Sequence, residues 1–204
     1  AYKAMIVNIS DAIVMNAIPK YALLSVAIPK SYSNEDLKEL AKGFKKAASE
    51  FGIEIIGGDT ISNEKLDISV TIISKVSNPI YRKGMNKGDI LCYTGTLGLC
   101  KIYLERLFKN KEVPKKSKFI KPILNADFFY EIAPLITTSM DISDGLFFEL
   151  ERLSKANKLG FEFFHKIDEE IGTSGEEYEI LFSFNENNLE KIKKIALKHK
   201  VKLN

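Results

Sequence analysis

Two kinds of apolar pattern alternate along this chain, and their mixture most constrains the fold. From Leu37 to Phe51, apolar residues recur with the 3.6-residue period of an amphipathic helix. Between Leu66 and Val76 they instead alternate with polar residues, as in a half-buried strand. Because helical and strand-like segments are interleaved throughout, we expect an α/β or α+β fold.

Local signals set the ends of several elements. Ser33 and Asp36 form a capping box before one helix, and Gly52 ends it. The sequence IEIIGGDT predicts a strand that runs into a glycine turn. The expected helices span 2–17, 34–51, 99–108, 119–136 with breaks at its prolines, 144–156 and 186–199, and the expected strands span 21–29, 53–60, 66–76, 90–98, 137–143, 161–165 and 177–184.

One segment divides the chain. Residues 109–118, KNKEVPKKSK, are basic and polar and include Pro114, as in a loop or linker. We therefore place an N-terminal domain at 1–112 and a C-terminal domain at 113–204. The chain begins without Met, and its apolar rhythm is already under way at Ala1, so we also expect a leading segment to be missing.

Composition excludes several classes of protein. A net charge of +3, with basic and acidic residues interspersed, provides no basic stripe for nucleic acid. The apolar runs are far shorter than the roughly 20 residues that span a bilayer, so we expect no membrane segment. Cys92 and Cys100 have no partners at zinc-ligand spacing, and we expect reduced thiols and a cytoplasmic protein.

Four aspartates stand beside small residues, at strand ends or within a helix: Asp11 in NISDA, Asp59 in GGDT, and Asp141 and Asp144 in DISDG. Each alone is better explained as a cap or turn residue. Together they indicate phosphate chemistry, because carboxylates can hold a phosphate only through a cation such as Mg²⁺. The Walker motif and the protein-kinase motifs are absent, so any nucleotide site has another architecture.

These motifs, taken in order, resemble the thiamine-monophosphate kinase family of the aminoimidazole-ribonucleotide-synthetase-like superfamily. The resemblance extends over nearly the whole chain. The matching segments are VNISDAIVMNAIPKYALLSVAIP, IIGGDT, YRKGMNKGD, YTGTLG, MDISDGL and SGEEYEILF.

The resemblance implies an ATP-dependent enzyme that phosphorylates thiamine monophosphate to thiamine diphosphate by direct, Mg²⁺-assisted phosphoryl transfer. It implies no catalytic side chain beyond those that position the substrates and the metal. The family's magnesium ligands correspond to Asp11, Asp59, Asp141 and Asp144, its ATP contacts to Gly58, Asp59, Arg82 and Ser143, and its thiamine-side contact to Glu176.

The family's architecture implies a homodimer in which the mixed sheets of the N-terminal domains form a barrel, while a C-terminal α/β domain closes over the active site. The chain departs from the family pattern in a few places. Asn16 and Ser174 replace glycines, and Glu177 replaces an aspartate. The family's acidic GDDAA segment would lie before Ala1.

Other readings remain open at this point. The related selenophosphate synthetases, aminoimidazole-ribonucleotide synthetases and hydrogenase-maturation dehydratases also use ATP, although the NISD and DISDGL motifs favour the thiamine enzyme. A different class is an inactive fragment that only dimerises through its strands.

Overall fold

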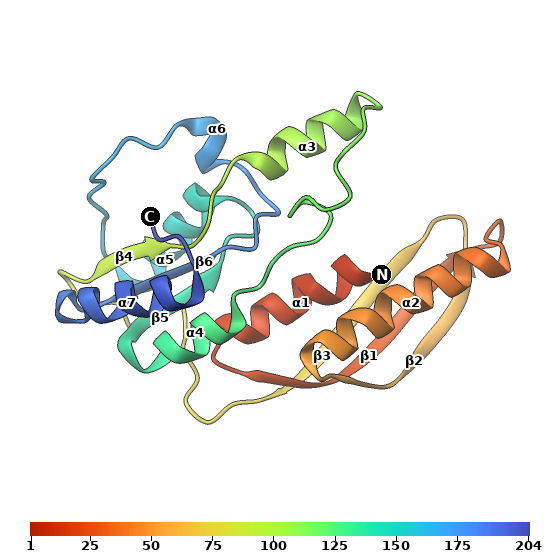
Figure 1. Ribbon diagram of the computed structural model, residues 1–204, viewed down its shortest axis with the longest axis horizontal. Helices are drawn as coiled ribbons and strands as arrows, with labels where there is room; N and C mark the ends of the chain where they lie inside the picture. Colours follow the sequence, from red (N-terminus) through yellow and green to blue (C-terminus); the bar gives the residue numbers. More distant parts are fainter. The chain divides into compact units, whose positions relative to one another are not determined.

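Two units make up the fold of residues 1–204, all of which the computed structural model describes (Figure 1). By their contacts, residues 78–112 belong to the second unit, whereas the sequence placed the boundary at 112/113. The roles assigned to the two domains stay predictions. The first unit comprises Ala1–Ile13 and Ala17–Ser77, and the second comprises Val14–Asn16 and Asn78–Asn204.

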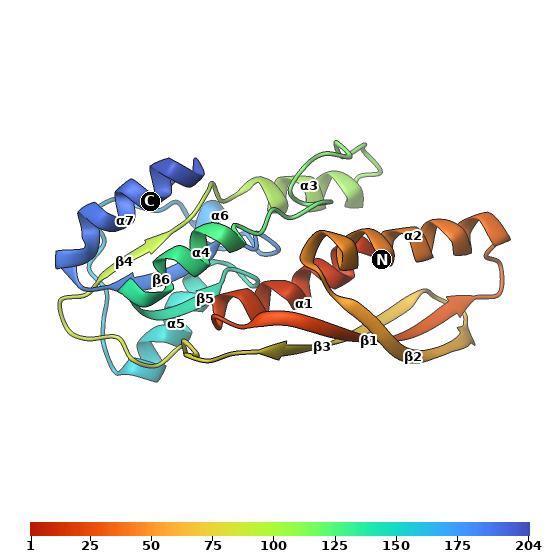
Figure 2. The same cartoon turned by 60° about the horizontal axis from the view of Figure 1, so that its bottom comes forward.

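A three-stranded mixed sheet with two helices forms the first unit. The sheet order is β2–β1–β3, with β1 parallel to β2 and antiparallel to β3, so the prediction of a mixed sheet is confirmed. Figure 2 shows α1 and α2 on the same face of this sheet. The elements are α1 (Tyr2–Val14), β1 (Ile18–Pro29), α2 (Asn34–Phe51), β2 (Glu54–Asn63) and β3 (Asp67–Lys75).

The core of this unit lies between the helices and the sheet. Met5, Ile6 and Ile9 of α1 are fully buried, as is Ala22 of β1. The predicted caps of α2 are confirmed: Ser33 accepts a hydrogen bond from the Asp36 N–H, the Asp36 carboxylate accepts one from the Ser33 N–H, and Gly52 ends the helix at φ 62°.

Two predictions for the first unit are wrong in detail. The first helix ends at Val14, and β1 begins at Ile18, so the strand includes Pro19. Proline is tolerated because the pairing of β1 with β3 shifts register between Pro19 and Tyr21. The expected glycine turn in GGDT does not form, since β2 continues through both glycines to Asn63.

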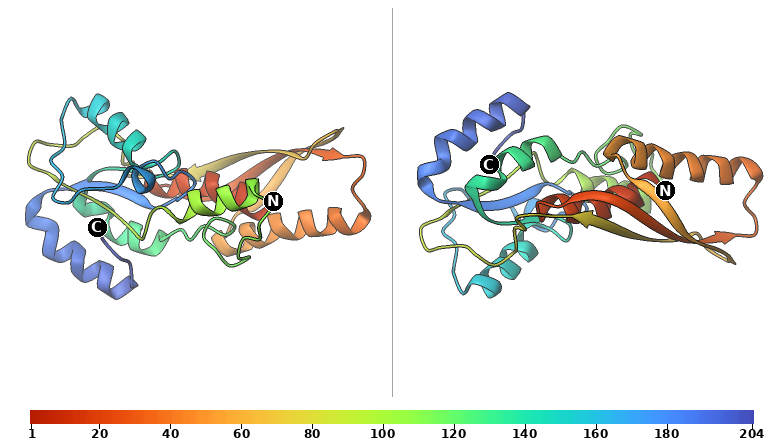
Figure 3. Two further views of the ribbon diagram at one scale, coloured as in Figure 1. Left: turned by 90° about the horizontal axis from the view of Figure 1, so that it is seen from above. Right: turned by 90° about the horizontal axis from the view of Figure 1, so that it is seen from below.

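The second unit contains an antiparallel sheet in the order β4–β6–β5. Figure 3 shows α4 and α7 on one face of the sheet and α5 on the other. The elements are β4 (Ile90–Tyr93), α3 (Leu99–Phe108), α4 (Ala126–Ile132), η1 (Ala133–Leu135), β5 (Ile136–Asp141), α5 (Leu146–Asn157), α6 (Glu169–Gly172), β6 (Ile180–Phe184), η2 (Glu186–Asn188) and α7 (Leu189–His199).

All five residues of the central strand β6 are buried, and alternate side chains serve the two faces. Phe182 packs edge-on against Phe128 of α4, with ring centroids 6.2 Å apart. Leu181 joins the cluster on the α5 side, which includes Leu146 and Leu150. This packing fixes the start of α5 against the sheet.

Three expectations for the second unit need correction. The helix expected over 119–136 is confined to Ala126–Ile132 and a short 3₁₀ turn. No strand forms at 161–165, where Phe163 and Phe164 are exposed. The strand expected over 90–98 ends at Tyr93. The helices of this fold include none that is both long and apolar enough to cross a membrane.

Candidate active site

The DISDG motif forms the turn between β5 and α5. Asp141 is the last residue of β5 and is only 3% exposed, and Ile142 behind it is fully buried. Ser143 and Asp144 then leave the sheet. Gly145 makes the turn into α5 with φ 112°, a value that side chains rarely adopt. The strand therefore holds Asp141 firmly, whereas Asp144 lies at the more exposed end of the turn.

Backbone hydrogen bonds place the predicted Glu176 segment beside this turn. Ile142 donates its N–H to the Glu179 carbonyl (2.8 Å), and the Tyr178 N–H returns a bond to the Ile142 carbonyl (2.9 Å). The Glu176 N–H donates to the Ser143 carbonyl at 2.7 Å. Residues separated by more than thirty positions in sequence are thus joined at one place.

The Glu176 segment has an uncommon backbone conformation. Glu176 and Tyr178 have φ values of 61° and 52°, although neither is glycine. Such residues cost of order 1–3 kcal/mol each and persist only where their surroundings hold them. A Cβ at Gly175 would lie 3.0 Å from the Ser143 carbonyl oxygen, so this segment approaches the turn closely.

The Glu177 carboxylate helps to hold the backbone conformation of this segment from inside the second unit. It is 2% exposed, and its Oε1 accepts hydrogen bonds from the Gly98 N–H at 2.8 Å and the Cys100 N–H at 3.2 Å. These two donors lie at the start of α3, where exposed N–H groups and the helix dipole favour a negative charge. The carboxylate therefore ties the Glu176 segment to α3.

Lys118 lies between two buried carboxylates. Its ammonium is 2.6 Å from Glu177 Oε2 and 2.9 Å from Glu179 Oε1, while Thr94 donates a 2.7 Å hydrogen bond to the other Glu179 oxygen. Burial lowers the pKa of Lys118, but the charges and hydrogen bonds of Glu179 and Glu177 outweigh that effect and raise the pKa. Gly95 leaves room for Glu179, because a Cβ there would lie 2.0 Å from its carboxylate.

Two of the departures from the family pattern form one contact. Ser174 is fully buried, and its hydroxyl donates a 2.6 Å hydrogen bond to Glu177 Oε1. The same hydroxyl accepts a hydrogen bond from the Lys101 N–H at 3.1 Å. The third departure is also compatible with the backbone, since Asn16 has φ 59°, a conformation that asparagine tolerates better than most residues.

Arg82 lies on an exposed segment that Asn157, the last residue of α5, attaches to the second unit. The Asn157 amide donates to the Arg82 carbonyl at 2.8 Å and accepts hydrogen bonds from the N–H groups of Gly84 and Met85. The Tyr81 carbonyl accepts a bond from the Ser139 N–H of β5. The backbone of Arg82 is thereby fixed beside β5 and its side chain is exposed.

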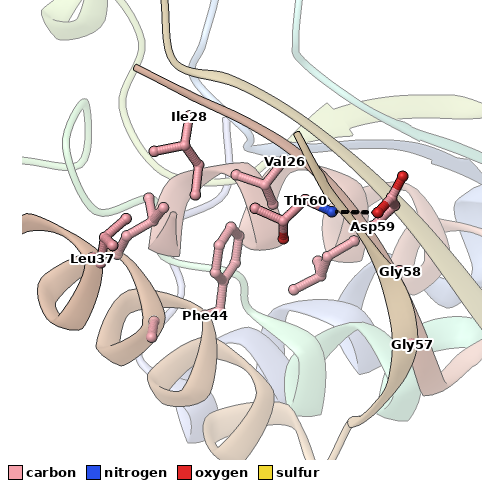
Figure 4. A pocket seen from close by; sticks show the side chains of 11 residues that line it. Val26, Ile28, Leu37, Phe44, Gly57, Gly58, Asp59 and Thr60 are labelled. Carbon is pink, nitrogen blue, oxygen red and sulfur yellow. Dashed lines mark hydrogen bonds between the residues drawn. The ribbon is translucent and has the colours of Figure 1, made fainter. Parts of the chain in front are cut away.

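In the first unit, Gly58 and Asp59 border an open pocket of ≈480 Å³ between α2 and the sheet. Figure 4 shows Asp59 at the end of this pocket away from Leu37, with a 2.8 Å hydrogen bond from the Thr60 N–H to the Asp59 carboxylate. The rest of the lining is largely apolar, including Val26 and Phe44. Asp11, the other predicted site residue of this unit, is exposed on α1.

Gly58 lies two residues after a β-bulge. The pairing of β1 with β2 shifts between Ala22 and Leu23, which leaves Ile56 without an opposite residue. Gly58 then has φ 145°, and a Cβ there would lie 1.8 Å from the Leu24 carbonyl oxygen. Only glycine fits this position, so the family-type GGD sequence has a backbone reason as well as a predicted binding role.

The predicted metal ligands do not form a group of three or more metal-binding side chains. That arrangement still suits Mg²⁺, which is commonly held by one or two carboxylates together with substrate phosphates and water. Asp144 is a suitable donor, since its side chain is 57% exposed. Asp141 at the end of β5 and, in the first unit, Asp59 at the pocket also carry carboxylate oxygens, the ligand type that Mg²⁺ prefers.

Sequence reasoning missed three charged residues near the turn: Lys118, Glu149 and Arg152. Lys118 lies in a segment rich in lysine, and nothing in its local pattern distinguishes it. Glu149 and Arg152 have a detectable signal, an acid and a base three positions apart at the start of a helix. That spacing by itself does not reveal that Glu149 is buried.

Comparison with known proteins identifies relatives. Residues 1–76 match the family described as AIR synthase related protein, N-terminal domain. The chain is 30% identical to the thiamine-monophosphate kinase of Nitrosopumilus maritimus (strain SCM1), over 96% of this chain and 69% of the relative. It is 31% identical to the thiamine-monophosphate kinase of Buchnera aphidicola subsp. Schizaphis graminum (strain Sg), over 98% of this chain and 69% of the relative.

A solved structure agrees with these matches. AaThiL, complexed with AMPPCP and TMP, superposes with a TM-score of 0.79 and 25% sequence identity, covering 92% of this chain and 70% of that one. The similarity extends across both units, so the mixed α/β architecture predicted from the sequence is confirmed.

Proposed function

Since this chain belongs to the thiamine-monophosphate kinase family, we propose that it transfers the terminal phosphate of ATP to thiamine monophosphate and forms thiamine diphosphate. The relatives carry that name, and the solved structure with TM-score 0.79 is described as a complex with AMPPCP and TMP. The substrates of this chain are therefore expected to be ATP and thiamine monophosphate.

One observation supports the activity most directly. The 2.7 Å hydrogen bond from the Glu176 N–H to the Ser143 carbonyl joins the segment proposed to contact the thiamine substrate to the turn proposed to contact ATP. Phosphoryl transfer depends mainly on the position of donor and acceptor and on electrostatic stabilisation. A fixed connection between the two segments meets the first of these needs.

In the second unit, each proposed residue has a distinct task. Arg82 offers a guanidinium, which suits bidentate phosphate contacts, and Ser143 offers a hydroxyl. Asp141 and Asp144 are proposed as magnesium ligands, and Glu176 is proposed to contact the thiamine substrate. We assign no nucleophile or general base, because direct transfer needs no covalent intermediate on the protein.

In the first unit, we propose Asp11 and Asp59 as magnesium ligands and Gly58 as an ATP contact. Gly58 is exposed, so its backbone is accessible to a ligand. When bound, Mg²⁺ would neutralise charge on the phosphates that transfer requires. We further propose that the protein is a homodimer joined through its first-unit sheets, that the second unit closes over the active site, and that the protein is cytoplasmic.

The test is an assay of thiamine diphosphate formation from thiamine monophosphate, ATP and Mg²⁺ with the full-length protein. We expect turnover that disappears with a chelator. We also expect roughly a 100-fold or greater loss for Asp141→Asn and a smaller loss for Asp144→Asn, because Asn removes a charge from the metal ligands. Asp141 should matter more because the strand holds it rigidly.

Asp127→Asn is the matched control, since Asp127 is an exposed acid in the first turn of α4. Its rate and melting temperature should stay close to those of the wild type. If Asp141 and Asp144 served only as cap or turn residues, their Asn variants would also remain near wild-type rates, because Asn caps about as well as Asp. That result would contradict the proposed metal roles, and a wild type without turnover would contradict the activity.

A further inference from the structure

Glu149 is a fully buried acid next to the candidate ATP-binding turn. It lies in the first turn of α5, and its side chain is 0% exposed. Its Oε1 accepts a 3.1 Å hydrogen bond from the Asp144 N–H and lies 3.4 Å from the Ser143 hydroxyl, which donates to it. One carboxylate oxygen thus contacts both polar residues of the turn.

Arg152 extends this contact to the side chain of Asp144. One guanidinium nitrogen, Nη1, lies 2.9 Å and 2.8 Å from the two Glu149 oxygens. The other, Nη2, lies 2.6 Å from Asp144 Oδ2. The guanidinium therefore joins a buried carboxylate to an exposed one and fixes the orientation of the exposed one.

Stability alone is a weak explanation for this arrangement. The Arg152 and Asp144 side chains are 45% and 57% exposed, and exposed ion pairs contribute little. Burying the Glu149 charge is costly, and a packed apolar residue would commonly serve the fold as well. What an apolar residue cannot do is accept hydrogen bonds from Ser143 and Asp144 and hold a guanidinium against them.

We propose that Glu149 is a positioning residue for ATP binding, acting directly on Ser143 and, through Arg152, on the Asp144 carboxylate. This inference rests on the proposed function, in which Ser143 contacts ATP and Asp144 binds the metal. Glu149 itself does not touch the substrate. Its loss leaves both residues in the chain and removes the restraint on their positions.

The test compares Glu149→Gln with Glu151→Gln in the full-length protein. Glu151 is a matched control on the same helix, exposed and paired with Lys155 instead of with the turn. Calorimetry gives the dissociation constant for a non-hydrolysable ATP analogue with Mg²⁺, and kinetics give KM for each substrate and kcat. All measurements are made at least about 20 °C below the melting temperature of each variant, so that only folded protein is compared.

We expect Glu149→Gln to weaken analogue binding and raise KM for ATP by about tenfold, the usual size of one lost charge-assisted contact. KM for thiamine monophosphate should change less than KM for ATP, and Glu151→Gln should change neither. Arg152→Lys is the second variant. It keeps a positive charge beside Glu149 but lacks the fork that reaches Asp144, so it should also weaken analogue binding while the protein stays folded.

The outcomes separate the two proposals. If the wild type binds the analogue and Glu149→Gln binds it equally well, the positioning role is overturned and the proposed function stands. A lower melting temperature with unchanged analogue affinity has the same meaning, since Glu149 would then serve only the fold. If the wild type does not bind the analogue, the proposed function fails and this inference fails with it.

Discussion

At the scale of single residues, the two substitutions at Ser174 and Glu177 explain each other. Glutamate is one methylene longer than the aspartate of the family pattern, and its carboxylate reaches the N–H groups of Gly98 and Cys100. The Ser174 hydroxyl fills the space beside that carboxylate and bonds to it at 2.6 Å. The sequence shows both changes but not their contact, because only the strained backbone around Glu176 brings them together.

This pairing predicts energetic coupling in a double-mutant cycle. Ser174→Ala should cost about 1.5–3 kcal/mol, because it removes a hydrogen bond to a buried charge. In the Glu177→Asp background the same change should cost clearly less, since the shorter carboxylate no longer reaches the hydroxyl. Urea unfolding of the four proteins gives the coupling energy, which we expect to lie within about 0.5–3 kcal/mol.

Glu170→Gln combined with Ser174→Ala is the control cycle, because Glu170 is exposed on α6. Its effects should add within about 0.5 kcal/mol. Additive effects in the Ser174–Glu177 cycle as well would show that the two departures are independent.

At the scale of elements, features set by residues close in sequence were predicted correctly, whereas features that depend on distant contacts were not. The capping box at Ser33, the αL residue Gly52 and the alternation of β3 are each set within a few residues, and all are present. The failures have distant causes. Residues 161–165 have the composition of a strand, but no neighbouring strand pairs with them. β2 runs through its glycines because Leu23 and Leu24 of β1 pair with both of them, directly after a bulge at Ile56.

The backbone conformation after the bulge predicts different effects at two adjacent glycines. Gly58→Ala should destabilise the first unit by about 1–3 kcal/mol or more, since its φ of 145° is strained for alanine and its Cβ would collide with the Leu24 carbonyl. Gly57→Ala is the matched control, because a Cβ there meets only Leu23 Cδ2 at 3.4 Å. Thermal unfolding of both variants measures the difference, and equal melting temperatures would contradict the strained backbone and close approach at Gly58.

In the candidate site, too, the part that is contiguous in sequence was predicted and the surrounding charged residues were not. The DISDG turn was predicted because its acids, serine and glycine are contiguous in sequence. The acids Glu149, Glu177 and Glu179 and their basic partners Arg152 and Lys118 were not predicted as parts of the site. Lys118 pairs with acids about sixty residues away in sequence, and the spacing of Glu149 and Arg152 does not show that Glu149 is buried. Buried ion pairs leave little trace in a single sequence when one partner lies in a lysine-rich loop.

At the scale of the whole molecule, the match of residues 1–76 to one family coincides with the first unit, which extends to Ser77. That unit leaves one face of its sheet without a helix of its own. Tyr21 and its cross-strand partner Ile73 are 43% and 44% exposed on this face, and Leu23 is 38% exposed. Neighbouring apolar side chains of this kind are typical of interaction surfaces.

We therefore predict a dimer through residues 21–28 and 66–76. Light scattering at micromolar concentration should give about twice the 23.0 kDa of this chain. Ile73→Lys should shift the mass towards the monomer by placing a charge in the apolar contact, while Lys75→Glu at the end of β3 should not. A wild type that stays monomeric under these conditions would contradict the proposed barrel.

The strand order β4–β6–β5 also has a consequence for how the chain is made. The middle strand is the last of the three to be synthesised, and both outer strands pair with it. Residues 90–93 therefore remain without a strand partner until about ninety further residues have been synthesised. All strands of the first unit's sheet are present once Lys75 has been made. Nascent chains can close the first sheet early, while the second assembles in a single late step that exposes β4 and β5 until then.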